Sequence, residues 1–261
     1  MNPAQHGAAV AAETAEFVAT VTAADLSTPV PTCPGWSLAD LTRHVGSVHR
    51  WFTELLRQRI QHPPTSRVVD LRLPEHTDAL PDWLAMSAAE AAEVFAATDL
   101  DAPMWAWGVD QHARFWVRRM LFETLVHRVD AQLALGRSPQ IDRALAVDGI
   151  DEFLTNLPHA ASFAPLTAQL RAPDRTIRFS CTDANTDADA DADGDWLVEL
   201  RPGGFALVAD HSEPRPADAT VRGTAADLLL LLYGRLDHRS EAFQLLGDTS
   251  LLAHWFTHSA F

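Results

Sequence analysis

Glu123 and His127 stand four positions apart in the segment FETLVHRVD. On an α-helix this spacing puts both side chains on one face, where they can share a ligand. Trp116 and Met120 fall on the same stripe, so the two polar groups are expected beside large apolar ones. Burying an unpaired carboxylate is costly, and a divalent cation would offset its charge. A surface pair or a hydrogen-bonded core pair would show the same spacing, so both alternatives stay open.

A third metal ligand should come from a second helix, and His44 is the best candidate. It follows Leu41 by three residues and precedes Val48 by four, so it borders the apolar stripe of its own helix. Zinc accepts imidazole nitrogen and carboxylate oxygen, and a catalytic zinc usually has three protein ligands and an open position. A fourth ligand, such as His49 or His112, would favour a structural metal instead. We expect His49 to lie further round the helix than His44, at the edge of the apolar stripe.

Helices must position these residues. Apolar periodicity predicts five of them in the N-terminal part of the chain, over about 5–24, 37–55, 81–98, 112–135 and 141–157. Ser37 and Asp40 form a variant of the capping box that starts the second helix. The segment 27–36 holds three prolines and a glycine, which predicts a loop.

The pattern changes after about residue 165. Segments 175–182 and 196–210 alternate apolar and polar residues and are typical of strands, and a short strand and a helix are expected after residue 218. We therefore predict an α+β protein, with a helical domain over 1–162 and a smaller α+β domain over 163–261.

Composition limits the partners and the compartment. The formal charge is −15, which disfavours nucleic acid and anionic membrane surfaces. The N-terminus shows no targeting pattern, and the two cysteines, Cys33 and Cys181, fit a reducing compartment, so a cytoplasmic location is predicted. We interpret Cys33 as a small buried residue, with a zinc-ligand or reactive role as the alternative. The acidic segment 183–195 begins like a calcium loop but has leucine at position twelve, so we interpret it as a solvated hairpin loop.

Two segments, TCPGWSLADLTRHVGSVHRW and FWVRRMLFETLVHRVDAQLALG, resemble the mycothiol-dependent maleylpyruvate isomerase family. The resemblance extends to VDGIDEFLT and ADLLLLLYGR and so covers most of the chain. It implies a DinB-like up-down helical bundle followed by a small, sterol-carrier-like α+β domain. It also implies metal ligands at His44, Glu123 and His127, and a catalytic arginine that matches Arg235.

The resemblance further implies the chemistry, which uses Zn²⁺ or another divalent metal together with mycothiol. A metal-bound thiol loses its proton near neutral pH, and the resulting thiolate adds to a cis double bond. After rotation about the new single bond the thiol leaves, and the product is the trans isomer. An S-transferase would stop at the adduct. Arg235, or Arg118 or Arg119, could hold the carboxylate of a small, acidic, electrophilic substrate. Asp130, one turn after His127, is a candidate acceptor for an imidazole N–H.

Two other classes of function stay open. Zinc could be structural in a metal-binding protein without catalysis. The C-terminal domain could also carry an apolar ligand, because small domains of this type resemble sterol-carrier folds.

Overall fold

The computed structural model describes residues 1–65, 69–183, 194–208 and 216–259. It divides into two compact units, Met1–Pro139 and Gln140–Phe261, which we describe separately. The acidic segment that begins like a calcium loop falls mostly outside the described residues. No described helix is long and apolar enough to cross a membrane.

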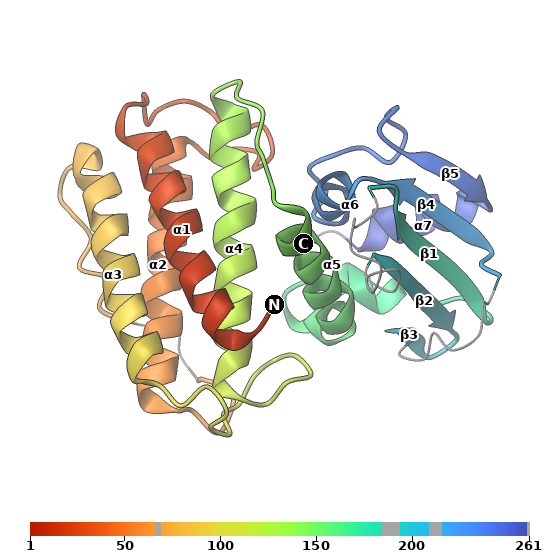
Figure 1. Ribbon diagram of the computed structural model, residues 1–261, viewed down its shortest axis with the longest axis horizontal. Helices are drawn as coiled ribbons and strands as arrows, with labels where there is room; N and C mark the ends of the chain where they lie inside the picture. The colour runs from red at the N-terminus through yellow and green to blue at the C-terminus, as the bar shows by residue number, and fades with distance from the viewer. Residues whose placement is uncertain (66–68, 184–193, 209–215, 260–261) are drawn as a thin grey trace. The chain divides into compact units, whose positions relative to one another are not determined.

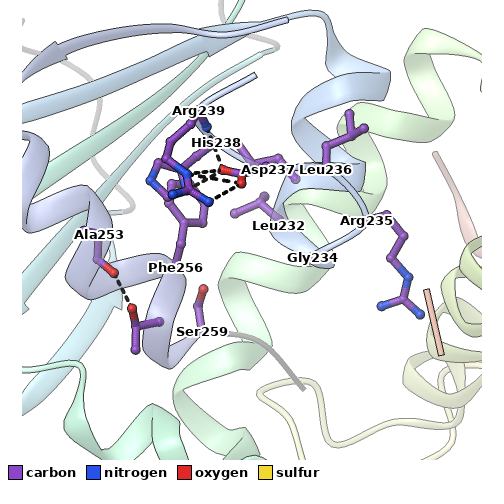
Figure 2. A pocket seen from close by; sticks show the side chains of 12 residues that line it. Leu232, Gly234, Arg235, Leu236, Asp237, His238, Arg239, Ala253, Phe256 and Ser259 are labelled. Atoms are coloured by element: carbon purple, nitrogen blue, oxygen red, sulfur yellow. Dashed lines mark hydrogen bonds and ion pairs between the residues drawn. The ribbon is translucent and has the colours of Figure 1, made fainter. Parts of the chain in front are cut away.

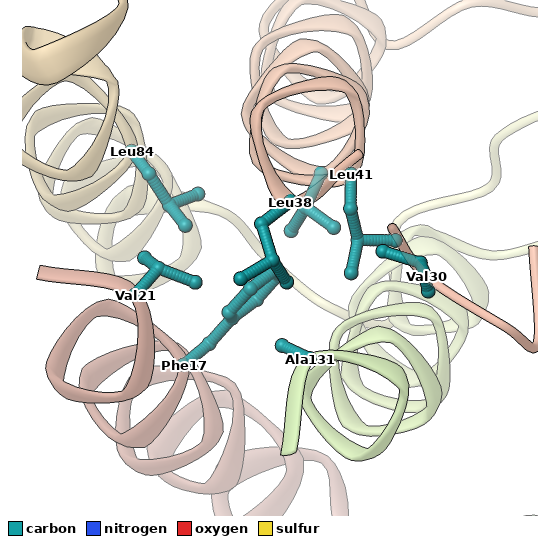
Figure 3. Packing of buried hydrophobic residues seen from close by; sticks show 8 residues of the cluster. Phe17, Val21, Val30, Leu38, Leu41, Leu84 and Ala131 are labelled. Atoms are coloured by element: carbon teal, nitrogen blue, oxygen red, sulfur yellow. The ribbon is translucent and has the colours of Figure 1, made fainter. Parts of the chain in front are cut away.

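Unit 1 is a four-helix bundle built from α1 (Pro3–Thr22), α2 (Leu38–Gln58), α3 (Leu80–Ala97) and α4 (Ala113–Ala134) (Figure 1). Helix α1 packs against α3 and α4, and α2 packs against the same two helices. A 3₁₀ turn, Thr77–Ala79, leads into α3. Buried side chains from every helix and from the loop before α2 meet in the core (Figure 3): Phe17, Val21, Val30, Leu38, Leu41, Val45, Leu84 and Ala131.

The start of α2 follows the predicted capping box. The backbone N–H of Asp40 donates to Ser37 Oγ, and the backbone N–H of Ser37 donates to Asp40 Oδ2. This reciprocal bonding satisfies two donors at the helix start and fixes the position from which the rest of α2 is counted.

In its described residues, unit 2 combines a five-stranded sheet with three helices. Its elements are α5 (Arg143–Asn156), 3₁₀ turns Leu157–Ser162 and Pro165–Gln169, β1 (Arg175–Cys181), β2 (Asp195–Arg201), β3 (Gly204–Leu207), β4 (Ala219–Gly223), α6 (Ala225–Leu232), β5 (Gln244–Gly247) and α7 (Thr249–His258). The strand order is β3-β2-β1-β4-β5, and among the described strands only β1 and β4 pair in parallel. Trp255 of α7 lies 5.7 Å from Phe179 and 5.4 Å from Phe205, measured between ring centroids, and covers one face of the sheet.

The structure confirms the α+β class and the helical N-terminal part of the chain, and it differs on where the second unit begins. Unit 2 starts at Gln140, whereas the sequence analysis placed the second domain at residue 163. Helix α5 packs on α6, where the rings of Phe153 and Tyr233 lie 4.9 Å apart. Periodicity predicted that α5 has a buried face but carries no information about which element covers it.

Candidate metal centre

Helices α2 and α4 bring the three predicted ligands together. His44 Nε2 lies 3.0 Å from Glu123 Oε1, and His127 Nε2 lies 3.4 Å from the same oxygen. The two imidazole rings meet edge to face, with centroids 4.9 Å apart. The three donor atoms lie within 4.8 Å of one another, so one cation could contact all of them.

The charges of this group are strongly coupled. Burial on its own would raise the pKa of Glu123, but hydrogen bonds from His127 and His44 and the nearby Arg119 guanidinium hold it well below its usual range. Burial would likewise lower the pKa of His127, but hydrogen bonds to Asp130, Cys33 and Glu123 hold it well above its usual range. Glu123 is therefore an ionised carboxylate with positively charged groups beside it, and a group of this kind can bind a cation.

Asp130 and Arg119 hold two of the three side chains in place. Asp130 Oδ2 lies 2.8 Å from His127 Nδ1, and the Asp130 side chain is fully buried. This bond leaves Nε2 directed at Glu123, as expected for a carboxylate behind a metal-binding histidine. Arg119 Nη2 donates to Glu123 Oε2 at 3.2 Å and is also buried. Arg119 thus contacts the Glu123 carboxylate and does not lie on a solvated basic edge of the helix, which was the alternative that the sequence left open.

The loop before α2 covers the group from one side. Two successive turns, closed by Cys33 N–H to Val30 C=O and Trp36 N–H to Cys33 C=O, wrap the Pro-Gly-Trp segment. Gly35 has φ +85°, a conformation that favours glycine. The Trp36 ring consequently lies 5.0 Å from the ring of His44.

A pocket of about 510 Å³ opens beside His44. Trp36, Asp40, Arg43 and Ser47 also line it. The side chain of His44 is 34% exposed and is the most accessible of the three candidate ligands.

Neither of the two alternative fourth ligands joins the group in the described part of the chain. His49 is fully buried, not at the helix edge as expected, and its Nε2 bonds Thr124 Oγ1 at 2.8 Å. His112 Nδ1 bonds Asp110 Oδ1 at 2.6 Å. Three protein donors leave coordination positions for other molecules, which is typical of a catalytic metal rather than a structural one.

Arg235 belongs to unit 2 and lines a different pocket, of about 590 Å³ (Figure 2). It follows Gly234, which has φ +72°, and its Nη1 donates to Tyr233 C=O at 2.6 Å. In Figure 2 its side chain points away from the ion pair between Asp237 and Arg239. The role of Arg235 in the reaction stays a prediction.

The two units thus define an α+β protein with a candidate three-ligand centre in an N-terminal helical bundle. The family model described as Mycothiol maleylpyruvate isomerase N-terminal domain matches residues 8–132, and the one described as MDMPI C-terminal domain matches residues 144–254. The chain belongs to this family.

Solved structures agree with this assignment at the level of the fold. The crystal structure of the mycothiol-dependent maleylpyruvate isomerase and that of a mutant of it each match with a TM-score of 0.61. Each match has 14% sequence identity and covers 94% of this chain and 93% of the other. No curated protein matches the chain in sequence.

Proposed function

We propose that the protein is a metal-dependent isomerase that uses mycothiol, with zinc held by His44, Glu123 and His127. The observation that carries the proposal is the meeting of two imidazole Nε2 atoms at one oxygen of Glu123, at 3.0 and 3.4 Å. The family supports the reaction class, because the solved proteins of the same fold are named mycothiol-dependent maleylpyruvate isomerase.

The residues fit a zinc ion in kind and in spacing. Zinc bonds of about 2.0–2.1 Å in a tetrahedron give donor–donor edges of roughly 3.3–3.4 Å. The two edges at Glu123 Oε1, 3.0 and 3.4 Å, are already close to that value. Along these two edges a cation requires only small side-chain shifts, and a cation at this centre alone leaves the bond from His127 Nδ1 to Asp130 in place.

A bound divalent cation would stabilise the thiolate of mycothiol at neutral pH, and this thiolate could add reversibly to the cis double bond of a maleylpyruvate-like acid. The chain's own residues prepare the site for this chemistry. Arg119 keeps the Glu123 carboxylate ionised and oriented. Asp130 fixes the ring of His127 through Nδ1. The Trp36 ring packs beside the ring of His44, and both line the pocket through which reactants would enter.

The same proposal includes an acidic substrate and a role for Arg235 in binding its carboxylate. Arg43 lines the pocket beside His44 and offers a guanidinium near the point of entry. Arg235 offers a second guanidinium in unit 2, at a pocket of its own. A guanidinium binds a carboxylate in two-pronged geometry, which suits a small dicarboxylate such as maleylpyruvate.

Both cysteines are free thiols, which fits the reducing cytoplasm in which mycothiol would be used.

Metal analysis and an isomerase assay test the proposal together. Purified wild-type protein is expected to hold at least about one zinc per chain and to convert maleylpyruvate only when mycothiol is present. His44→Ala and Glu123→Ala should lose activity and the zinc bound at this centre while keeping the helical circular dichroism signal. His62→Ala, which removes an exposed histidine of unit 1, is the matched control and should keep both. Unchanged metal content in Glu123→Ala would show that the assigned ligands are wrong.

Product analysis separates isomerase from S-transferase. An isomerase regenerates the free thiol and accumulates the trans acid, whereas a transferase consumes the thiol and accumulates a thioether. Accumulation of the thioether would replace the proposed isomerase with the transferase. Co-purified lipid with no turnover would favour the apolar-ligand carrier.

A further inference from the structure

Cys33 lies beside the candidate metal centre, on the side of His127 that faces away from Glu123. The turn that begins at Val30 places Cys33 Sγ 3.5 Å from Asp130 Oδ2. The same carboxylate oxygen lies 2.8 Å from His127 Nδ1. The three donor atoms of Cys33, Asp130 and His127 lie within 4.8 Å of one another, as do those of the first group.

The kinds of donor point to a thiophilic divalent cation. A thiolate, an imidazole nitrogen and a carboxylate oxygen are ligands of zinc, cobalt and cadmium. A metal–sulfur bond of about 2.3 Å and a metal–oxygen bond of about 2.1 Å give a tetrahedral edge of roughly 3.6 Å. The distance from Cys33 Sγ to Asp130 Oδ2 already matches this edge, and the edge to His127 Nδ1 must open by about half an ångström.

We propose that Cys33, Asp130 and Nδ1 of His127 form a second cation site, back to back with the first across the ring of His127. Nε2 of this ring faces Glu123, and Nδ1 faces Asp130. The cation takes the place of two protons, one from Cys33 Sγ and one from His127 Nδ1, and both protons are released to solvent.

Charge balance supports two cations in so small a space. With both sites filled, the ligands are two carboxylates, one thiolate and one imidazolate, which together offset two divalent cations. Asp130 is fully buried, and its carboxylate contacts Cys33 Sγ and His127 Nδ1. The Cys33 side chain is only half-buried, so the second site can be reached from outside the bundle.

The other reading of the cluster is that Asp130 only orients His127 and that Cys33 only fills space. Cys33 does pack against the apolar core cluster of unit 1. The two readings differ in one observable, because only the second cation site forms a bond between sulfur and metal. A cobalt ion reports this bond through a thiolate-to-cobalt charge-transfer band in the near ultraviolet.

The test is a Co²⁺ titration of the full chain after chelator treatment, with a non-thiol reductant present. Wild type should bind two Co²⁺ and develop the charge-transfer band. Cys33→Ser should bind one and lack the band. Cys181→Ser is the matched control and should behave as wild type, because Cys181 lies in unit 2 and burial raises the pKa of its thiol to about 12. His44→Ala should keep the band and bind one.

The His44→Ala variant keeps this proposal separate from the proposed function, because it removes a ligand of the first site only. A band in His44→Ala supports the second site even if the first group binds no metal. Absence of the band in wild type, or its persistence in Cys33→Ser, would overturn the second site. Uptake of a single Co²⁺ by wild type would overturn the proposal that two cations share the ring of His127.

Discussion

His49 makes the stability of the metal-free protein depend on pH in a calculable way. Burial lowers the pKa of this histidine from 6.5 to about 4, although the nearby Glu123 charge acts in the opposite direction. Thr124 donates its hydroxyl to Met120 C=O, so His49 Nε2 donates to Thr124 Oγ1. In the described structure His49 Nδ1 has no hydrogen-bond partner, so a second proton there would be buried without an acceptor.

The sign and the size follow from linkage. The folded state holds His49 neutral, so the resulting stability is present above about pH 6.5 and is lost as the pH falls toward about 4. A shift of roughly 2.5 pKa units is worth at most about 3.4 kcal/mol, and about 2 kcal/mol of it is lost between about pH 7.5 and pH 5.

The assay is urea denaturation of metal-free wild type and His49→Gln at about pH 7.5 and about pH 5. The amide of glutamine can keep the bond to Thr124 but takes up no proton. Wild type should lose about 2 kcal/mol more than His49→Gln on acidification, because groups that do not interact with His49 contribute equally to both proteins. His62→Gln, at an exposed histidine, should lose as much as wild type. Equal losses in wild type and His49→Gln would refute the reasoning.

Three further predictions concern packing, metal affinity and substrate binding. Gly46→Ala should lower the free energy of unfolding by about 1–3 kcal/mol in denaturant titrations, because a Cβ there would overlap the buried ring of Trp83. Asp130→Asn should weaken zinc binding by about 10- to 100-fold in a chelator competition, because the amide holds the ring of His127 less firmly; an unchanged affinity would contradict this. Arg235→Ala should lower kcat/KM for the acidic substrate by about ten- to a hundredfold with metal content unchanged, and an unaffected kcat/KM would remove Arg235 from the reaction.

Most of the helical bundle could be predicted from the sequence because its signals are local. The predicted helix ends lie within three residues of those observed for α1 to α5. Cap residues, prolines and apolar spacing act over a few positions and can be recognised without tertiary information. Strand β5 and helix α7 were missed. The four residues of β5 are mostly exposed and show no clear alternation, and α7 is only ten residues long.

The candidate site was only partly predictable because depth and contact between helices are tertiary properties. The spacing of Glu123 and His127 put both on one face, the apolar stripe around His44 made it the best third candidate, and the resemblance implied the same three residues. Nothing in α2 alone shows that His49 would be fully buried while His44 stays one-third exposed, because α4 determines this by where it packs. The contact of Cys33 with Asp130 joins residues 97 positions apart, and it depends on the turn before α2.

The organisation of the site around His127 explains why so few shifts are needed to receive a cation. One nitrogen of this ring faces Glu123, and the other is held by Asp130, so the ring cannot turn without breaking both interactions. Arg119 prevents the same rotation at Glu123. Each of the two ligands on α4 is therefore held by a buried, charged neighbour on the same helix, one turn away. The third ligand, His44, lies on α2, which packs on α3 and α4, and the bond between His49 and Thr124 belongs to the contact with α4. Fully buried and without charge, His49 can keep the two helices in register without competing for the cation.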